Sequence, residues 1–336
     1  MAKITYDIVL ADIHEYFSSR VMEFCAQFDL SFFLAEPFWA EDLLKKVRAG
    51  ELYARVYIDF ASDHREPDNQ YFALAEAFKK LGSYMIDDPD RVVVASDKGM
   101  FHLALLESGV SVPETVIVKR SELAGFRMTD EIKARVGVPF VVKPGWGSGR
   151  WGVNLYATSK DDLLRSADEV TYSDTFLVQQ KIVPKKLEGK TGWFRAFNVF
   201  EEVIICWWDP QTGNYQLVSP REMARYSLSP LADMVRDIQR ISGVNFFSTE
   251  IAKTEDNRFL TIDYLNTGCD MHAKSFWPSG PPDEVVRHIA WEMVDHAMTV
   301  ARDHRGPFDD ELDMIDQEWE AHQNHLPPVQ GAGSGA

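Results

Sequence analysis

The 336 residues suffice for about two or three domains, and 45% hydrophobic with 26% charged residues is an ordinary composition for a globular protein. The net charge of −17 argues against broad binding to nucleic acids or to anionic membranes. No apolar run is long enough to cross a bilayer, and the N-terminus lacks a signal-peptide pattern. We therefore expect a cytoplasmic enzyme that binds neither nucleic acid nor membrane.

The first third of the chain mixes short strand-like runs with helical periodicity, which predicts an N-terminal α/β domain over residues 1–97. Gly82 is the expected stop of its clearest helix, and Ser96 or Asp97 is the expected cap of the helix that follows the domain. The predicted elements are a strand at 55–60, a helix at 69–81, a strand from Tyr84 and a helix at 99–108.

A glycine-rich segment in the middle of the chain is its most informative feature. The strand-like run 140–143 ends in Lys143, a loop with four glycines covers 144–152, and a second strand-like run covers 153–156. Glycines let backbone N–H groups close around an anion, which Lys143 can also reach. The segment therefore predicts a flap over nucleotide phosphates, with an ordinary hairpin loop as the alternative.

Other nucleotide-binding loops fit this segment less well. Residues 147–152 match the dinucleotide fingerprint, but that motif needs a helix directly after the glycines, and the helix signal here begins only near Ser159. No Gly-Lys-Ser/Thr triplet closes the loop, as a P-loop requires. Protein kinases cover ATP with a similar strand–turn–strand, but the chain has no His-Arg-Asp or Asp-Phe-Gly triplet.

The rest of the chain predicts two further subdomains and a tail. The central subdomain is expected over 98–184, the C-terminal subdomain over 185–310, and a partly flexible tail over 311–336. The elements predicted after the flap are strands at 174–184, 193–200, 202–208, 246–253 and 258–265, and helices at 231–242 and 283–303.

The last predicted hairpin carries polar groups among apolar neighbours. Glu250 lies on its first strand, and Asp263 and Asn266 lie on its second. A buried carboxylate is unfavourable unless it is paired or metal-bound, and oxygen ligands of this kind suit Mg²⁺. The alternative is that Glu250 and Asp263 are solvent-facing positions of half-exposed strands. Asp270 is a further candidate ligand, with a role in a turn as its alternative.

Taken in chain order, the segments described above resemble those of the ATP-grasp family over about residues 90–300. The resemblance rests on the pair Asp97-Lys98 before a helix, the turn 109–115, the strand 141–144 with its flap, the strand 178–182, the strand 194–197 and the acidic hairpin. It implies an α/β (α+β) fold in which two α+β subdomains clasp ATP after an N-terminal α/β domain.

The resemblance also implies a role for single residues. Those that would contact phosphates are Lys98, Lys143, Gly147, Ser148 and Gly149. Those that would contact adenine are Gln179, Gln180, Lys181 and Ile182. Arg195 and Lys143 would be catalytic, and Arg195 would hold a phosphate or the acyl-phosphate transition state. The ligands of Mg²⁺, or alternatively Mn²⁺, would be Glu250, Asp263 and Asn266.

The acidic hairpin and the hinge depart from the family's pattern. The family has an acid, one residue and then asparagine, which places both side chains on one face. Here two residues separate Asp263 from Asn266, and a β-bulge would restore the common face. The first metal ligand would be Glu250 where aspartate is commoner, and the hinge has glutamines where glutamate is common. Glu188 is a candidate for the ribose hydroxyls.

The function implied by the resemblance is an ATP-dependent carboxylate–amine ligase. A small-molecule or peptide carboxylate would attack the γ-phosphate, and an amine, or less often a thiol, would displace phosphate from the acyl phosphate. The alternatives are a small-molecule kinase on the same fold and a nucleotide-binding protein without ligase activity. A second copy of the chain is a further candidate partner. Arg221 and Arg225 are candidates for binding the substrate carboxylate, with a solvated surface as the alternative.

Overall fold

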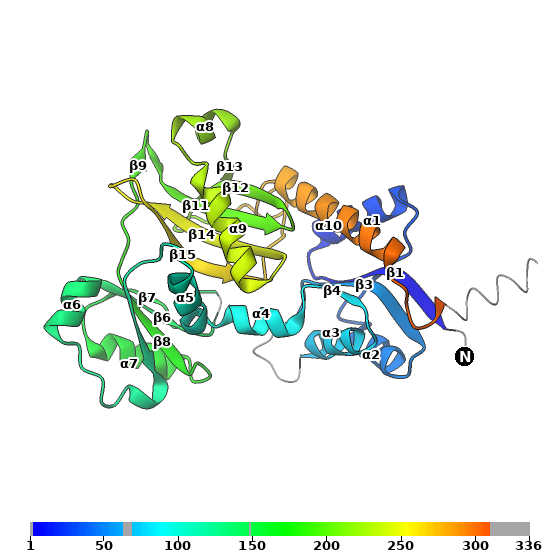
Figure 1. Ribbon diagram of the computed structural model, residues 1–336, viewed down its shortest axis with the longest axis horizontal. Helices are drawn as coiled ribbons and strands as arrows, with labels where there is room; N and C mark the ends of the chain where they lie inside the picture. The colour runs from blue at the N-terminus through cyan, green and yellow to red at the C-terminus, as the bar shows by residue number, and fades with distance from the viewer. Residues whose placement is uncertain (1–2, 63–68, 148, 310–336) are drawn as a thin grey trace, which may run out of the picture.

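The computed structural model describes residues 3–62, 69–147 and 149–309. Three main sheets organise these residues, and Figure 1 shows them as an N-terminal unit, a central subdomain and a C-terminal subdomain. Within the described residues, no helix is both long and apolar enough to cross a membrane. The expected tail, 311–336, lies outside them.

The N-terminal unit is a parallel sheet of order β2-β1-β3-β4 with helices on both faces. Side chains of β1 alternate between two cores: Ile8 and Leu10 pack with α1 and α10, whereas Val9 packs with α2 and α3. The elements are β1 (Ile4–Ala11), α1 (Glu15–Gln27), β2 (Phe32–Leu34), α2 (Ala40–Arg48), β3 (Leu52–Asp59), α3 (Gln70–Lys80) and β4 (Tyr84–Ile86).

Two helices connect this unit to the rest of the chain. Helix α4 (Pro89–Ser96) begins with a proline, which fits the first turn of a helix because the missing N–H would have no partner there. Helix α5 (Lys98–Glu107) begins at the predicted cap: the Asp97 carboxylate accepts the N–H groups of Gly99 and Met100 at 2.9 and 3.0 Å.

The central subdomain is an antiparallel sheet of order β5-β8-β6-β7, with α6 and α7 packed against it. The predicted strand 174–184 is shorter in the structure, because β8 ends at Gln179, the last residue that its partners β5 and β6 pair with. The elements are β5 (Thr115–Lys119), η1 (Arg120–Glu122), α6 (Asp130–Val136), β6 (Phe140–Pro144), β7 (Asn154–Ala157), α7 (Lys160–Glu169) and β8 (Thr175–Gln179).

The C-terminal subdomain is an antiparallel sheet of order β13-β12-β11-β14-β15. Helices α5 and α9 cover one face, and α10 covers the other. The elements are β9 (Lys186–Leu187), β10 (Lys190–Thr191), β11 (Trp193–Val199), β12 (Glu202–Asp209), β13 (Asn214–Leu217), α8 (Pro220–Arg225), α9 (Pro230–Ser242), β14 (Phe246–Lys253), β15 (Phe259–Asn266) and α10 (Asp283–Asp303).

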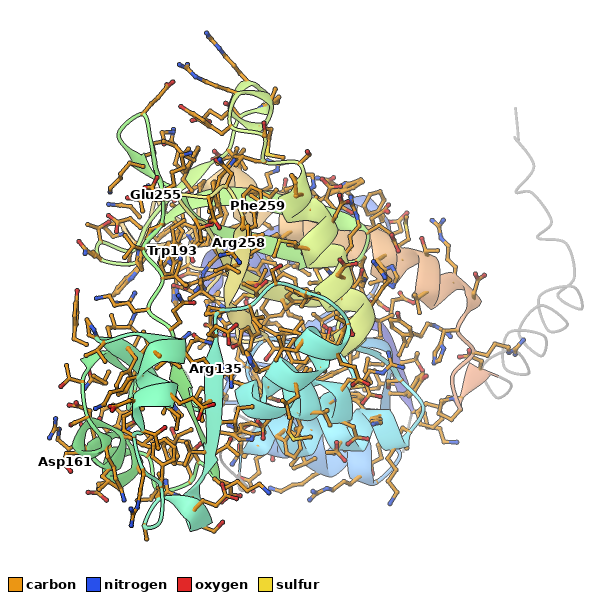
Figure 2. All side chains as sticks on the ribbon, turned by 60° about the vertical axis from the view of Figure 1, so that its left-hand side comes forward. Arg135, Asp161, Trp193, Glu255, Arg258 and Phe259 are labelled. Carbon is orange, nitrogen blue, oxygen red and sulfur yellow. The ribbon has the colours of Figure 1, made fainter. Side chains whose placement is uncertain are left out.

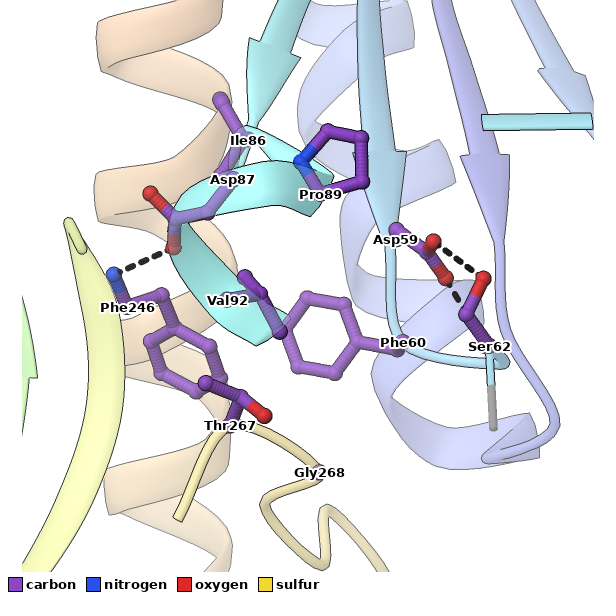
Figure 3. Close-up of a pocket in the computed structure, with 10 residues that line it drawn as sticks. All are labelled: Asp59, Phe60, Ser62, Ile86, Asp87, Pro89, Val92, Phe246, Thr267 and Gly268. Carbon is purple, nitrogen blue, oxygen red and sulfur yellow. Dashed lines mark hydrogen bonds between the residues drawn. The ribbon is translucent and has the colours of Figure 1, made fainter. Parts of the chain in front are cut away.

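Asp87 joins the N-terminal unit to the C-terminal subdomain. It follows β4, and its carboxylate accepts the backbone N–H groups of Asn245 and Phe246 at 2.7 and 2.8 Å; Figure 3 shows the bond to Phe246. Burial raises the pKa of Asp87 to about 7, although these hydrogen bonds act in the opposite direction. A titratable group near neutrality therefore lies at the junction of the two units.

Candidate nucleotide-binding site

A cleft of about 300 Å³ lies between the central and C-terminal sheets. Trp193 of the C-terminal subdomain forms part of the wall of this cleft. Figure 2 labels Trp193 on the side of that subdomain that faces the central subdomain, on which Asp161 is labelled. Ten of the predicted residues line the cleft: Lys98, Lys143, Gly147, Gly149, Gln179, Gln180, Lys181, Ile182, Glu250 and Asp263. Ser148 lies outside the described residues.

The two predicted lysines point at carbonyl oxygens on opposite sides of the cleft. Lys143, near the end of β6, donates from Nζ to the carbonyl oxygen of Ile262 at 2.8 Å. Lys98, at the start of α5, donates to the carbonyl oxygen of Gly147 at 2.8 Å. Burial lowers the pKa of Lys143, and the charges of Asp263 and Glu250 oppose this effect. An anion in the cleft can take the place of either carbonyl oxygen.

The glycine-rich loop between β6 and β7 is anchored at its ends and open in its middle. A Cβ on Gly145 would lie 2.0 Å from Oγ1 of Thr175, and one on Gly152 would lie 2.3 Å from Cγ2 of Val170. Gly152 also has a φ of +69°, which L side chains rarely adopt. A Cβ on Gly149 would meet nothing within 4 Å. Packing therefore excludes side chains at the two anchors, and the middle of the loop stays accessible.

The predicted adenine wall begins with Gln179, which is 1% exposed. Its Nε2 donates to Oγ1 of Thr115 at 3.0 Å and to the hydroxyl of Tyr264 at 2.7 Å. The same hydroxyl lies 2.6 Å from Nδ1 of His102, whose pKa burial lowers to about 4. The amide nitrogen of Gln179 therefore links the two subdomains. Because it is already used in these bonds, the neighbouring residues of this wall would have to supply the groups that contact adenine.

Lys181 and Ile182 continue this wall. The ammonium group of Lys181 lies 3.2 Å from the ring centroid of Tyr156, an aromatic residue of β7 that also lines the cleft. Apolar contacts come from Val141 and Leu155. An apolar wall with few polar groups is typical of a pocket that binds a planar ring.

Glu250 and Arg195 lie opposite each other on β14 and β11 and form an ion pair. The indole N–H of Trp193 donates to the other oxygen of Glu250 at 3.0 Å. Sequence reasoning missed Trp193, although it lies two residues before Arg195 and alternation places both on one face of β11. Arg195 does not line the cleft directly and reaches it through Glu250.

Asp263 lies beside Glu250 in the register of β14 and β15. Burial acts to raise the pKa of Asp263, but the charges of Lys98, Lys143 and Arg195 outweigh it and lower the pKa. The carboxyl group therefore stays ionised, and it faces the positive groups that a phosphate chain would also approach.

A β-bulge of the kind that would restore the common face of Asp263 and Asn266 is present. Asp263 pairs with Glu250 and Asn266 pairs with Ser248, so two residues of β15 oppose one residue of β14. The two residues between Asp263 and Asn266, Tyr264 and Leu265, both pack into the core formed with α5 and α9. The register therefore returns Asn266 to the face of the strand that carries Asp263, although Asn266 does not line the cleft and its role as a metal ligand stays a prediction.

Other predicted candidates lie outside the cleft. Asp270 bonds to Nδ1 of His272 at 2.6 Å. Glu188 is paired with Arg225, accepts the hydroxyl of Tyr226 at 3.0 Å and does not line the cleft; its ribose role stays a prediction. Arg221 and Arg225, the candidates for the substrate carboxylate, lie on α8 and do not line the cleft, and the guanidinium of Arg225 is paired with Glu188; their role stays a prediction.

No protein-family model matches the chain, and no curated protein sequence matches it. Among solved structures, D-alanine–D-alanine ligase from Bacillus anthracis complexed with ATP aligns with a TM-score of 0.61 at 12% identity, over 91% of this chain and 100% of that one. D-cycloserine synthetase DcsG aligns with a TM-score of 0.61 at 14% identity, over 86% and 99%. The ATP-grasp ligase PsnB, complexed with minimal precursor, Mg and ADP, aligns with a TM-score of 0.57 at 14% identity, over 88% and 98%. At these identities the similarity establishes a shared fold.

Proposed function

We propose that this chain, which has the ATP-grasp fold that its sequence predicts, is an ATP- and Mg²⁺-dependent ligase that joins a carboxylate to an amine. One observation carries the proposal. Lys98 and Lys143 line one cleft together with Glu250 and Asp263 from the facing sheet. Cations for phosphates and carboxylates for a metal ion are what binding of a metal nucleotide requires.

The donor set fits Mg²⁺. Glu250 and Asp263 offer carboxylate oxygens from register partners, and Asn266 offers an amide oxygen from the position that the bulge restores. Hard oxygen ligands of this kind suit Mg²⁺, which shares its coordination with substrate phosphates. When bound, the ion would neutralise charge on the transferred phosphoryl group. Glu250 would exchange its ion pair with Arg195 for the metal.

Lys98 and Lys143 would release their carbonyl partners and hold the phosphate chain under the glycine-rich loop. Arg195, released from Glu250, would stabilise the charge that develops as the substrate carboxylate attacks the γ-phosphate. That attack would release ADP and form an acyl phosphate, and an incoming amine would then attack the acyl carbon, form the amide bond and displace inorganic phosphate. The side chains of this site orient groups and neutralise charge, and none has to form a covalent bond.

The cysteines fit a mechanism without a thiol nucleophile. All three are buried in the structure. Burial raises the pKa of Cys25 and of Cys206 to about 12 and that of Cys269 to about 11. A thiolate, not a thiol, is the nucleophile in cysteine catalysis. These side chains therefore stay protonated and unreactive at neutral pH.

Turnover with trapped intermediates tests the proposal. The purified protein is incubated with ATP, Mg²⁺, hydroxylamine and pools of amino acids and short peptides, because PsnB was solved with precursor peptides. We expect ADP, free phosphate and a hydroxamate, since hydroxylamine captures an acyl phosphate. ADP without free phosphate would indicate a kinase. Nucleotide binding without turnover in any pool would indicate a binding protein.

A further inference from the structure

A second cluster of metal-ligating side chains lies apart from the nucleotide cleft. It consists of His14, which follows β1, and of Asp270 and His272 in the loop between β15 and α10. Each side chain offers one ligand atom, and these atoms lie within 4.8 Å of one another. The two imidazole rings are 4.6 Å apart and meet edge to face. None of the three lines the nucleotide cleft.

The loop presents its two ligands by alternation. Cys269, Met271 and Ala273 are buried in the core with α10, so Asp270 and His272 point away from that core on the same side. Nδ1 of His272 lies 2.6 Å from Oδ1 of Asp270. Both side chains are 46% exposed, which leaves them room to rotate toward an ion.

The third ligand, His14, is oriented by a hydrogen bond to a buried carboxylate. Asp12 is 2% exposed, and its carboxylate accepts Nδ1–H of His14 at 2.6 Å and the hydroxyl of Ser18 at 2.5 Å. The bond to Asp12 places the proton on Nδ1 and leaves the lone pair of Nε2 free. Nε2 lies 3.8 Å from Oδ1 of Asp270. A buried carboxylate behind a histidine is a recurring way to orient an imidazole toward a metal ion.

We propose that His14, Asp270 and His272 bind a divalent transition-metal ion such as Zn²⁺. Two imidazoles and one carboxylate are a ligand set that Zn²⁺ accepts, whereas Mg²⁺ prefers oxygen ligands alone. Zn²⁺ takes such ligand atoms at roughly 2.0–2.2 Å from the ion, and the exposed side chains of Asp270 and His272 can exchange their mutual hydrogen bond for the metal. The exposed side leaves the fourth position to water or to a ligand from solution.

An ion at this site would join two parts of the fold. His14 belongs to the N-terminal unit, and Asp270 and His272 belong to the loop that leaves the C-terminal sheet. Binding to the folded protein alone would raise its stability by mass action. The site is independent of the proposed ligase function, since it shares no residue with the nucleotide cleft.

Calorimetric titration with Zn²⁺ tests this inference. The tag-free full chain is treated with a chelator and titrated in excess Mg²⁺, which occupies oxygen-only sites. We expect one Zn²⁺ per chain in the wild type, no comparable binding in H14A and H272A, and about 10–100-fold weaker binding in D12N, which keeps all three ligands. H288A is the matched control, because His288 is a half-exposed imidazole of α10 paired with Glu292.

Two further readouts decide between a metal site and a surface cluster. Co²⁺ in place of Zn²⁺ should give visible absorption bands that H272A lacks, and Zn²⁺ should raise the melting temperature of the wild type and H288A but not of H14A. His272 is exposed, so H272A should fold normally, which its circular dichroism verifies. Equal Zn²⁺ affinity in the wild type and H272A, or no measurable binding by the wild type, would overturn the inference.

Discussion

Arg195 and Glu250 form an ion pair across the adjacent strands β11 and β14, and each side chain is only 13% exposed. Trp193 donates to the same carboxylate, so both oxygens of Glu250 have a partner before any ligand arrives. A metal ion that uses Glu250 must therefore compete with the guanidinium. If the metal ion replaced Arg195 as the partner of Glu250, the guanidinium would become free to contact the substrate when the metal nucleotide binds.

Replacing Arg195 with glutamine should impair turnover far more than nucleotide binding. We expect R195Q to lower kcat about 10²–10³-fold, the loss typical for a group that stabilises developing charge. The dissociation constant of ATP, measured by calorimetry without Mg²⁺ so that no metal competes for Glu250, should change little, because Arg195 does not line the cleft. Steady-state kinetics with any accepted substrate gives the comparison.

The variant also leaves Glu250 without its cation, so its stability must be measured separately. We expect R195Q to lose a few kcal/mol on urea denaturation and R195Q/E250Q to regain part of the loss without regaining activity. R258Q, which breaks the exposed pair with Asp256, should resemble the wild type in both assays. Wild-type turnover by R195Q would refute the catalytic role.

Removing the charge of Lys143 should weaken nucleotide binding. K143M keeps the length and apolar stem of the side chain but cannot hold a phosphate. We expect the dissociation constant of ATP to rise at least about tenfold, or 1.4 kcal/mol. The melting temperature should stay close to that of the wild type, because burial already disfavours the ammonium form. K160A, an exposed lysine that bonds to the carbonyl of Ala124, is the control. Unchanged ATP affinity in K143M would disprove the phosphate role.

Two glycines of the loop allow a matched test of its anchoring. Gly149 and Gly152 both have positive φ, at 62° and 69°, but only at Gly152 would a Cβ collide with Val170. We expect G149A to cost about 1 kcal/mol of stability from backbone strain alone. G152A should cost clearly more and weaken ATP binding, because the base of the loop has to shift. Thermal melting and ATP titration of both variants measure the difference, and equal effects would mean that the anchor is not required.

The hydroxyl of Tyr264 links the subdomains that close over the cleft. Y264F removes its hydrogen bonds to Gln179 and His102 and leaves buried polar atoms without a partner. We expect a loss of about 1–3 kcal/mol in the free energy of unfolding, together with weaker ATP binding. Tyr172 is half-exposed and not part of this network, so Y172F should have little effect on either quantity. If Y264F matched Y172F in urea denaturation, the link would be energetically unimportant.

Asp87 should make stability depend on pH near neutrality. Its pKa is about 7 in the folded protein and about 4 in the unfolded chain, so the folded state binds more protons between these values. Stability from this group is therefore present at low pH and is lost as the pH rises through 7. From pH 6 to pH 8 the free energy of unfolding of the wild type should fall by about 1 kcal/mol relative to D87N. Urea denaturation at each pH measures this slope, and parallel curves would contradict the assignment.

Local periodicity predicted much of the fold. Helix α10 matches the predicted range 283–303, and α3 lies within its predicted range, 69–81, with Asn69 as its cap. The parallel strand β1 had no specific prediction, because its partner β3 lies more than 40 residues away and its register depends on packing of α1 and α10. Amphipathic helices carry their own signal, whereas parallel strands depend on distant partners.

The candidate site likewise has parts that follow from local sequence patterns and parts that depend on contacts with distant residues. The lysines, the glycine-rich loop and the acidic strand pair could be predicted because each has a local pattern. The bond from Lys143 to Ile262 joins residues 119 positions apart, and nothing near either residue indicates it. Gln179 was predicted to contact adenine, but whether its amide nitrogen is available depends on Tyr264, which belongs to another sheet. Contacts between subdomains therefore could not be predicted from local sequence patterns.

Helix α10 is the last helix of the described chain, yet it packs against α1, β1 and β3 near the other end of the sequence (Figure 1). A ribosome adding about 5–20 residues per second completes β3 at least roughly ten seconds before it completes α10. Until then the face of the sheet that carries Ile8 and Leu10 lacks α10, one of the two helices that pack on it. We therefore expect the nascent N-terminal unit to be most open to chaperones and to aggregation in the time between its own synthesis and that of α10.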